Sequence, residues 1–282
     1  MSTFTKVLLA TDLSPQADKL TECLFSLCPD TETEVVLAHV FDDDDDADPD
    51  GSSFKRTQSR LEGYKNDIEQ AGYEEISIVT RTGDISETVQ GLAEEYDVDL
   101  VLVASHRKGF LKRALMGSTT FDLARLAAVP LLINKAEPHE EQENLLRTIM
   151  VPTDFSRKSL EALNIIRSLR EFVGKVVFVH VIEHSRNKHD YKEKYGSAML
   201  FLQELVDEMK MFGIEADYHV AHGVASKKIA AICEHEDVSL IMMAKTGADM
   251  THGEELGSTS ENVVLNVDCA VMLVPAEDSD DI

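Results

Sequence analysis

Cysteine is scarce in this sequence of 282 residues, and its placement argues against a zinc domain. Only four cysteines occur, at Cys23, Cys28, Cys233 and Cys269. Cys23 and Cys28 are separated by four residues, but no further cysteine or nearby histidine pair completes a zinc pattern. We therefore expect reduced, inert thiols and no metal site.

Long apolar runs are also missing, since no stretch of 18 or more apolar residues occurs. A membrane-spanning helix would need such a stretch. The first residues, Met1 to Lys6, do not form the pattern of a signal peptide. We expect a cytoplasmic protein without membrane insertion.

Positive charge is in short supply: 27 lysines and arginines stand against 52 aspartates and glutamates, for a net charge of −25. Such a chain repels nucleic acid and anionic membranes, so neither is an expected partner. The acidic run from Asp42 to Asp46 lacks the spaced ligands and central glycine of a calcium loop, and we interpret it as a solvated loop. With 43% hydrophobic residues, the chain is nonetheless typical of a globular protein.

The chain contains one tandem repeat, because segments of the first half recur in the same order in the second. Each half has the usual size of one domain, and we predict domains at residues 1–136 and 146–276. The matching pairs are Thr11-Asp12 with Thr153-Asp154, His39-Val40 with His180-Val181, and Gly117-Ser118-Thr119 with Gly257-Ser258-Thr259.

Strand-like apolar runs alternate with helix-like stretches throughout both halves. This order predicts an α/β protein with two tandem doubly wound domains, each a five-stranded parallel sheet flanked by helices, in a Rossmann-like fold. The predicted strands are 6–11, 34–40, 76–80, 99–104 and 130–134, then 148–152, 175–181, 216–220, 239–243 and 270–274. The predicted helices are 14–27, 54–71, 85–96 and 118–127, then 158–172, 191–212, 226–235 and 260–266.

A glycine-containing stretch from Ala244 to Thr259 connects a predicted strand to a predicted helix. Glycine lets backbone N–H groups approach a ligand closely, and a helix N-terminus attracts anions. A phosphate cradle is the functional interpretation, and a plain strand-to-helix loop is the alternative. Sheets of this kind bind ligands at the carboxyl ends of their strands, so the stretch should meet Asp154 and Val181 in one crevice. Asp12 and Val40 are the first-half counterparts.

With these motifs the chain resembles the universal stress protein family, in its tandem two-domain form. The family carries the pattern G-x2-G-x9-G-[S/T], which its ATP-binding members use to hold phosphates. The second half reads Ala244-x2-Gly247-x9-Gly257-Ser258 and keeps three of the four marked positions. The first half reads Ala104-x2-Arg107-x9-Gly117-Ser118 and keeps two. The resemblance implies a fold like that of the adenine nucleotide alpha hydrolases.

The resemblance also implies a ligand, which is ATP or a related adenine nucleotide held mainly by the second half. It places an aspartate on the ribose, a valine against the adenine, and the glycine motif on the phosphates. The implied site residues are Pro152, Thr153, Asp154, Val181, Ala244, Gly247, Gly257, Ser258 and Thr259. The weaker first-half candidates are Thr11, Asp12, Val40, Ala104, Arg107, Gly117, Ser118 and Thr119.

In each half, a departure from the family pattern affects either the glycines or the charge of the loop, so that the half with more of the glycines has the less favourable charge for phosphates. Alanine replaces the first glycine in both halves, and Arg107 replaces the second glycine in the first half. The first-half loop is basic, with Lys108, Lys112 and Arg113, whereas the second-half loop is acidic, with Asp249, Glu254 and Glu255. A Mg²⁺ ion bridging carboxylates and phosphates would ease the conflict in the second half.

Three functions remain open from the sequence: a nucleotide-binding stress or regulatory protein, an interaction or scaffold protein with decayed nucleotide pockets, and an enzyme. We expect no enzyme, because no general base stands at a recognisable spacing, although slow ATP hydrolysis stays open. His39 and His180 recur at strand ends, where we expect them to make structural hydrogen bonds.

The last strand of each half, 130–134 and 270–274, resembles the dimerisation strand of the family. The two halves are therefore expected to pair as an internal pseudo-dimer, which would cover two exposed strand edges. A homodimer of whole chains stays open.

Overall fold

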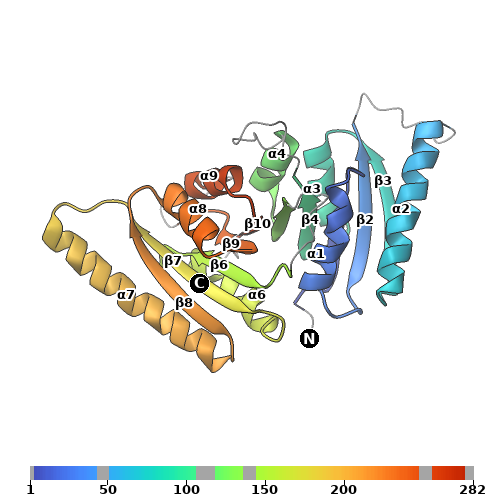
Figure 1. Ribbon diagram of the computed structural model, residues 1–282. Coiled ribbons are helices and arrows are strands. Elements are labelled where there is room, and N and C mark those ends of the chain that lie inside the picture. Colours follow the sequence, from blue (N-terminus) through green and yellow to red (C-terminus); the bar gives the residue numbers. More distant parts are fainter. Residues whose placement is uncertain (1–2, 43–50, 106–117, 136–143, 248–255, 277–282) are drawn as a thin grey trace, which may run out of the picture. The chain divides into compact units, whose positions relative to one another are not determined.

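The computed structural model describes residues 3–42, 51–105, 118–135, 144–247 and 256–276. The chain divides into two compact units, Met1–Gln142 (unit 1) and Glu143–Ile282 (unit 2) (Figure 1). Unit 1 contains β1 (Lys6–Ala10), the 3-10 helix η1 (Ala17–Lys19), α1 (Leu20–Leu27), β2 (Glu34–Phe41), α2 (Ser52–Gln70), β3 (Ile76–Thr82), α3 (Ile85–Glu95), β4 (Leu100–Ala104), α4 (Ser118–Leu126) and β5 (Leu131–Asn134). Unit 2 contains β6 (Thr148–Pro152), α5 (Arg157–Leu160), α6 (Ala162–Ser168), β7 (Lys175–Ile182), α7 (Lys188–Met211), β8 (Glu215–His222), α8 (Ala225–His235), β9 (Leu240–Ala244), α9 (Ser258–Asn266) and β10 (Ala270–Val274).

Each unit is built on a parallel sheet in which the first strand lies at the centre. The strand order in unit 1 is β3-β2-β1-β4-β5. Unit 2 repeats it as β8-β7-β6-β9-β10. In unit 1, β2 and β3 are added on one side of β1, and β4 and β5 are added on the other side. In unit 2 the same change of side occurs between β6 and β9. These are the switch points at which doubly wound sheets open a crevice for ligands. The predicted α/β fold class is confirmed.

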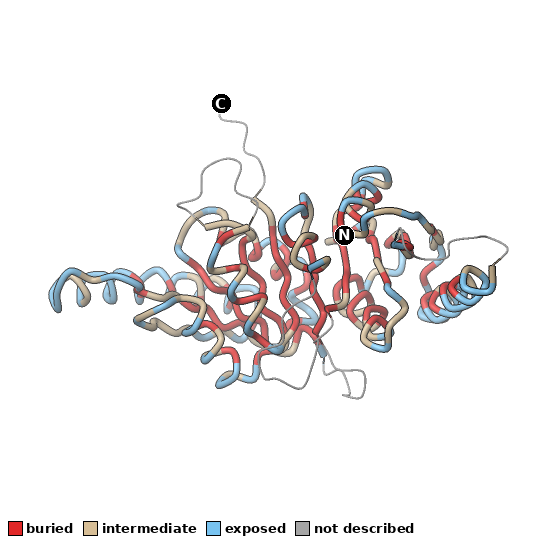
Figure 2. Tube along the Cα trace, turned by 90° about the horizontal axis from the view of Figure 1, so that it is seen from above, coloured by how far each residue is buried: buried red, intermediate tan, exposed pale blue. Residues whose placement is uncertain are grey.

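The core of each unit lies on both faces of its sheet. In unit 1, α1 contacts α2 and α3 contacts α4, as expected for two helical layers. Val7, Leu8 and Leu9 on β1 are fully buried, and all five residues of β9 are buried as well. A strand that is covered on both faces consists of a nearly continuous apolar run, so its position can be predicted from the sequence. Figure 2 shows the strands buried and the outer faces of the helices exposed.

Two predicted helices differ from the structure in their form and not only in their bounds. The helix expected from residue 14 begins only at Ala17, as the 3-10 helix η1, and the hydroxyl of Ser14 accepts from the backbone N–H of Ala17 at 3.1 Å. The single helix expected at 158–172 is instead the pair α5 and α6. In α5 the hydroxyl of Ser159 donates to the carbonyl of Ser156 at 2.9 Å, and such local hydrogen bonds compete with a regular helix.

No helix in the part of the chain that the structure describes is long and apolar enough to cross a membrane.

Candidate functional site

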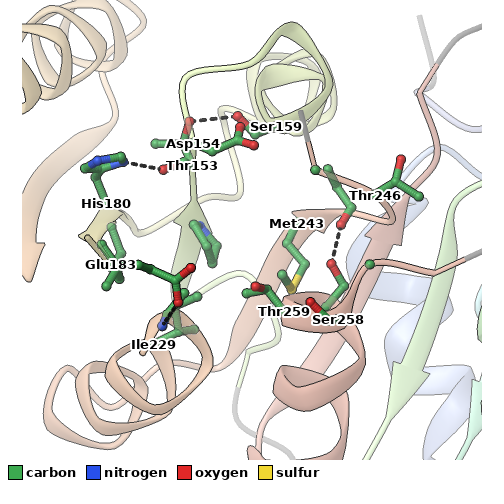
Figure 3. Close-up of a pocket in the computed structure, with 18 residues that line it drawn as sticks. Thr153, Asp154, Ser159, His180, Glu183, Ile229, Met243, Thr246, Ser258 and Thr259 are labelled. Carbon is green, nitrogen blue, oxygen red and sulfur yellow. Dashed lines mark hydrogen bonds between the residues drawn. The ribbon is translucent and has the colours of Figure 1, made fainter. Parts of the chain in front are cut away.

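A cavity of about 320 Å³ opens in unit 2 at the carboxyl ends of β6, β7 and β9. The first turns of α8 and α9 complete its wall (Figure 3). The structure brings together around it all the second-half residues that the sequence singled out, namely Pro152, Thr153, Asp154, Val181, Ala244, Gly247, Gly257, Ser258 and Thr259. Segments far apart in the sequence therefore meet in one crevice.

Asp154 lies in a tight turn that follows β6. The hydroxyl of Thr153 accepts from the backbone N–H of Phe155 at 2.9 Å, and Oδ1 of Asp154 accepts from the backbone N–H of Ser156 at 3.0 Å. Phe155 takes a positive φ of 65°, which turns the chain sharply. The turn holds the Asp154 carboxylate at the cavity wall beside Gly247.

Unit 1 repeats this turn after β1. The hydroxyl of Thr11 accepts from the backbone N–H of Leu13 at 3.0 Å, and Oδ1 of Asp12 accepts from the backbone N–H of Ser14 at 3.0 Å. Leu13 takes a positive φ of 60°, close to the 65° of Phe155 in unit 2. The Thr-Asp pair thus produces the same local geometry twice, independently of the helix that follows.

The two recurring histidines brace these turns from the neighbouring strand. Nδ1 of His180 lies 2.9 Å from the carbonyl oxygen of Thr153, and Nδ1 of His39 lies 2.8 Å from that of Thr11. Because a carbonyl only accepts, Nδ1 carries the hydrogen and donates it. The ring of His180 also stacks on Phe155, with 4.3 Å between the centroids. The predicted structural role of His39 and His180 is confirmed.

The N-terminus of α9 forms the opposite side of the cavity. Gly257 is the N-cap in an extended conformation, and it has no side chain to accept from the first turn. Its N–H donates to the carbonyl of Lys245 at 3.0 Å, which joins the two ends of the intervening segment. The buried hydroxyl of Ser260 donates to the carbonyl of Ala244 at 2.9 Å and fastens α9 to the end of β9. The first turn, with Ser258 and Thr259, thereby faces the cavity as an anion-attracting group.

The N-terminus of α8 meets the cavity as well, but a carboxylate already occupies it. Glu183, which follows β7, accepts from the backbone N–H of Ala225 at 2.7 Å (Figure 3). The N-cap position of α8 is Val224, which has no acceptor in its side chain. In unit 1 the corresponding helix α3 is capped by its own Asp84, which accepts from the N–H of Glu87 at 3.0 Å. In unit 2 the N-terminus of α9 can therefore attract an anion, whereas the N-terminus of α8 already has the carboxylate of Glu183 as its partner.

The charge lining the cavity is negative. Asp154 and Glu183 both line it, and none of the described lining residues is a lysine or arginine. This matches the acidic character of the second-half loop in the sequence, although residues 248–255 of that loop lie outside the described residues. The described lining therefore offers hydrogen-bond donors at the N-terminus of α9 but no positively charged side chain that would neutralise a polyanion.

Several lining residues were not among the predicted site residues. Val179 shares a strand face with Val181, so side-chain alternation along β7 was a signal that could have found it. Glu183 follows β7 directly. The α8 contributions, Ala225 and Ile229, had no such signal, because only the fold places α8 beside the cavity. The remaining additions are Ser159, His180, Met243, Thr246 and Ser260.

The first-half candidates are placed only in part. Thr11 and Val40 are buried, Asp12 is exposed, and Ala104 ends β4. Ser118 and Thr119 begin α4, at the position that Ser258 and Thr259 hold in unit 2. Arg107 and Gly117 lie outside the described residues, together with the basic residues of that loop.

Both units thus define a doubly wound α/β protein, and in unit 2 a cavity opens at the switch point of the sheet. A family model described as the Universal stress protein family matches residues 3–135 and again 146–275. The chain belongs to this family, with two tandem copies of its domain.

Individual relatives agree with this assignment. Universal stress protein MJ0531 of Methanocaldococcus jannaschii is 28% identical over 145 residues, which cover 47% of this chain and 84% of that protein. A solved universal stress protein from Archaeoglobus fulgidus covers 96% of this chain and 98% of its own, with a TM-score of 0.75 and 22% identity. A putative universal stress protein from Pseudomonas aeruginosa covers 98% and 95%, with a TM-score of 0.70 and 16% identity. At these identities the two solved structures show the shared fold.

Proposed function

We propose that this protein is a stress-response or regulatory protein that binds an adenine nucleotide in the cavity of unit 2. The observation that carries the proposal is the convergence of Asp154, Val181 and the N-terminus of α9 on one space at the switch point of the sheet. A volume of about 320 Å³ lies within the range of small-molecule sites. One solved universal stress protein is described as a complex with cAMP. For the present chain, the proposal rests on its own residues.

Each part of the cavity suits a different part of a nucleotide. The carboxylate of Asp154 is a strong acceptor for ribose hydroxyls, since hydrogen bonds to an ionised group are short and strong. The apolar side chains of Val181 and Ile229 suit a purine ring. Backbone N–H groups and the hydroxyls of Ser258 and Thr259 suit phosphate oxygens at a helix N-terminus.

The charge of the cavity favours a nucleotide bound with Mg²⁺. A triphosphate would bring several negative charges toward Asp154 and Glu183, and no described lining residue carries a compensating positive charge. Hard cations prefer carboxylate and phosphate oxygens. An ion shared between the phosphates and a carboxylate of the cavity would neutralise their charge. We propose Mg²⁺ as part of the ligand rather than as a resident metal.

A binding role fits the site better than a catalytic one. Nδ1 of His180 already donates to a backbone carbonyl, so this nitrogen is engaged in holding the turn.

A second candidate function, that of an interaction or scaffold protein, is favoured by a specific observation on α7. There Met199, Leu200 and Phe201 expose 38%, 70% and 52% of their surface.

Calorimetric titration of nucleotide-free protein with Mg–ATP tests the proposal. We expect one site per chain, and we expect Gly257→Leu to abolish binding because the side chain would stand at the mouth of the α9 N-terminus. Gly196→Leu is the matched control, since an added Cβ at Gly196 in α7 would meet nothing within 4 Å. Absence of heat and of any shift in melting temperature would favour the interaction protein. Two sites per chain would overturn the emphasis on unit 2.

A further inference from the structure

Two of the four cysteines meet in unit 2. Cys233 lies in the last turns of α8 and is buried, whereas Cys269 lies just before β10 and is partly exposed. Their sulfur atoms are 3.2 Å apart. This is closer than two non-bonded sulfur atoms usually pack, and the structure holds both residues as thiols. Cys23 and Cys28, by contrast, are buried in unit 1.

We propose that Cys233 and Cys269 form a reversible disulfide. A disulfide has a sulfur–sulfur distance of about 2.0 Å, so closure requires an approach of about 1 Å, which small side-chain rotations supply. α8 already packs against α9, and Cys269 lies in the short connection between α9 and β10. The sequence alone did not suggest the pair, because the two cysteines belong to different elements that only the fold brings together.

The difference in exposure assigns the order of the chemical steps. A small-molecule disulfide such as oxidised glutathione reaches Cys269 first, because that side chain is partly exposed. The Cys269 thiolate attacks one sulfur of the reagent, forms a mixed disulfide and releases one glutathione thiolate. The Cys233 thiolate then attacks the sulfur of Cys269, forms the internal disulfide and releases the second. In total the protein gives up two protons and two electrons, and oxidised glutathione is reduced to two molecules of glutathione.

The bond would join α8 to the segment that follows α9, and both helices contribute to the cavity. α8 carries Ala225 and Ile229, and α9 carries Ser258 and Thr259. The crosslink would tie the last turns of α8 to the chain that leaves α9. It would also close a covalent loop that contains β9 and all of α9, which limits the conformations of unfolded unit 2. This inference does not depend on nucleotide binding.

The first test follows the thiols in the full-length chain. Reduced, desalted protein is incubated with oxidised glutathione and analysed by intact mass and by non-reducing peptide mapping. We expect the intact mass to fall by two hydrogen atoms, and a crosslinked peptide pair to contain Cys233 and Cys269. Dithiothreitol should restore the original mass. A persistent glutathione adduct on Cys269, a crosslink between two chains, or four unmodified thiols would each overturn the proposal.

Matched variants separate the internal bond from other oxidation. Cys233→Ser should stop the reaction at the glutathione adduct on Cys269, whereas Cys269→Ser should prevent the reaction at unit 2 altogether. In the wild-type chain we expect oxidation to raise the melting temperature of unit 2 by a few degrees. Neither variant should show this shift. A lower melting temperature after oxidation would mean that the bond strains unit 2, which contradicts the geometry on which the proposal rests.

Discussion

Asp154 and Gly247 face each other across the wall of the cavity in unit 2. A Cβ built on Gly247 would stand 3.4 Å from Oδ2 of Asp154, which is an ordinary contact distance. Gly247 does not adopt a positive φ, so its backbone tolerates other residues. A methyl group therefore fits here, but any larger side chain would extend toward the carboxylate. The glycine at this position is explained by the space that it leaves beside Asp154.

This relationship predicts a graded effect at position 247. Gly247→Ala should bind Mg–ATP nearly as well as the wild type. Gly247→Val should weaken binding by about tenfold or more, because it fills the space beside Asp154, and each tenfold loss corresponds to about 1.4 kcal/mol. Titration calorimetry measures the affinity, and thermal unfolding checks that the variants are folded. Equal affinity of all three proteins would exclude this wall of the cavity as the binding surface.

The paired turns of the two units provide an internal control for the role of Asp154. Asp154→Asn keeps an acceptor for the N–H of Ser156 and removes the charge, so the turn should persist. We expect the affinity for nucleotide to fall about tenfold, since a hydrogen bond to a charged group is worth about 1.5–3 kcal/mol and one to a neutral group about 0.5–1.5 kcal/mol. Asp12→Asn makes the same change in unit 1 and should leave the affinity unchanged. If Asp12→Asn has the larger effect, unit 1 holds the ligand.

Much of this fold was predictable, because its strands are buried on both faces. β6 and β10 were predicted to the residue, since each is a short and largely apolar run of strand length. The interruption between α5 and α6 was not, because the apolar positions of this segment continue through it at helical spacing. The positive φ of Leu13 could not be predicted either, since leucine rarely adopts a positive φ.

The residues of the candidate site were likewise predictable only in part. Residues that follow a strand directly, such as Asp154 and Gly247, could be placed from the rule that ligands bind at carboxyl ends of parallel strands. Glu183 could not be recognised as the cap of α8, because the N–H it accepts from lies 42 residues further along the chain. Contacts between distant segments need the three-dimensional structure.

Glu183 combines a structural and an electrostatic role that substitutions can separate. Glu183→Ala should destabilise unit 2 by about 1 kcal/mol, the usual cost of losing a helix cap. Glu183→Gln keeps an acceptor for the N–H of Ala225, so its stability should stay close to that of the wild type. Both variants remove a negative charge from the cavity, so both should bind a nucleotide triphosphate more tightly. Thermal unfolding and calorimetry measure the two effects, and unchanged affinity in both variants would place the phosphates away from this residue.

Glu236 predicts how the stability of unit 2 depends on pH. Oε2 of Glu236 accepts from Lys175 Nζ at 3.1 Å, and Oε1 lies 2.9 Å from Nε2 of His219. The hydrogen bond from Lys175, followed by that from His219, holds the pKa of this carboxyl below its ordinary value of 4.5. A carboxyl with a lowered pKa in the folded state stabilises the protein above its unfolded pKa, and this stabilisation is lost as the pH falls through the folded pKa.

Glu236→Gln should therefore lower the melting temperature of unit 2 at pH 7 and reduce its dependence on pH below about 4.5, because the titrating group is gone. Glu204→Gln is a suitable control, since Glu204 is exposed on α7. Melting temperatures measured across the acid range for the three proteins test the expectation. If Glu236→Gln and Glu204→Gln lose stability in parallel with the wild type down to acid pH, the contacts with Lys175 and His219 do not stabilise the fold. If the difference between Glu236→Gln and the wild type shrinks as the pH falls, the ion pair between β7 and the end of α8 contributes through its charged form.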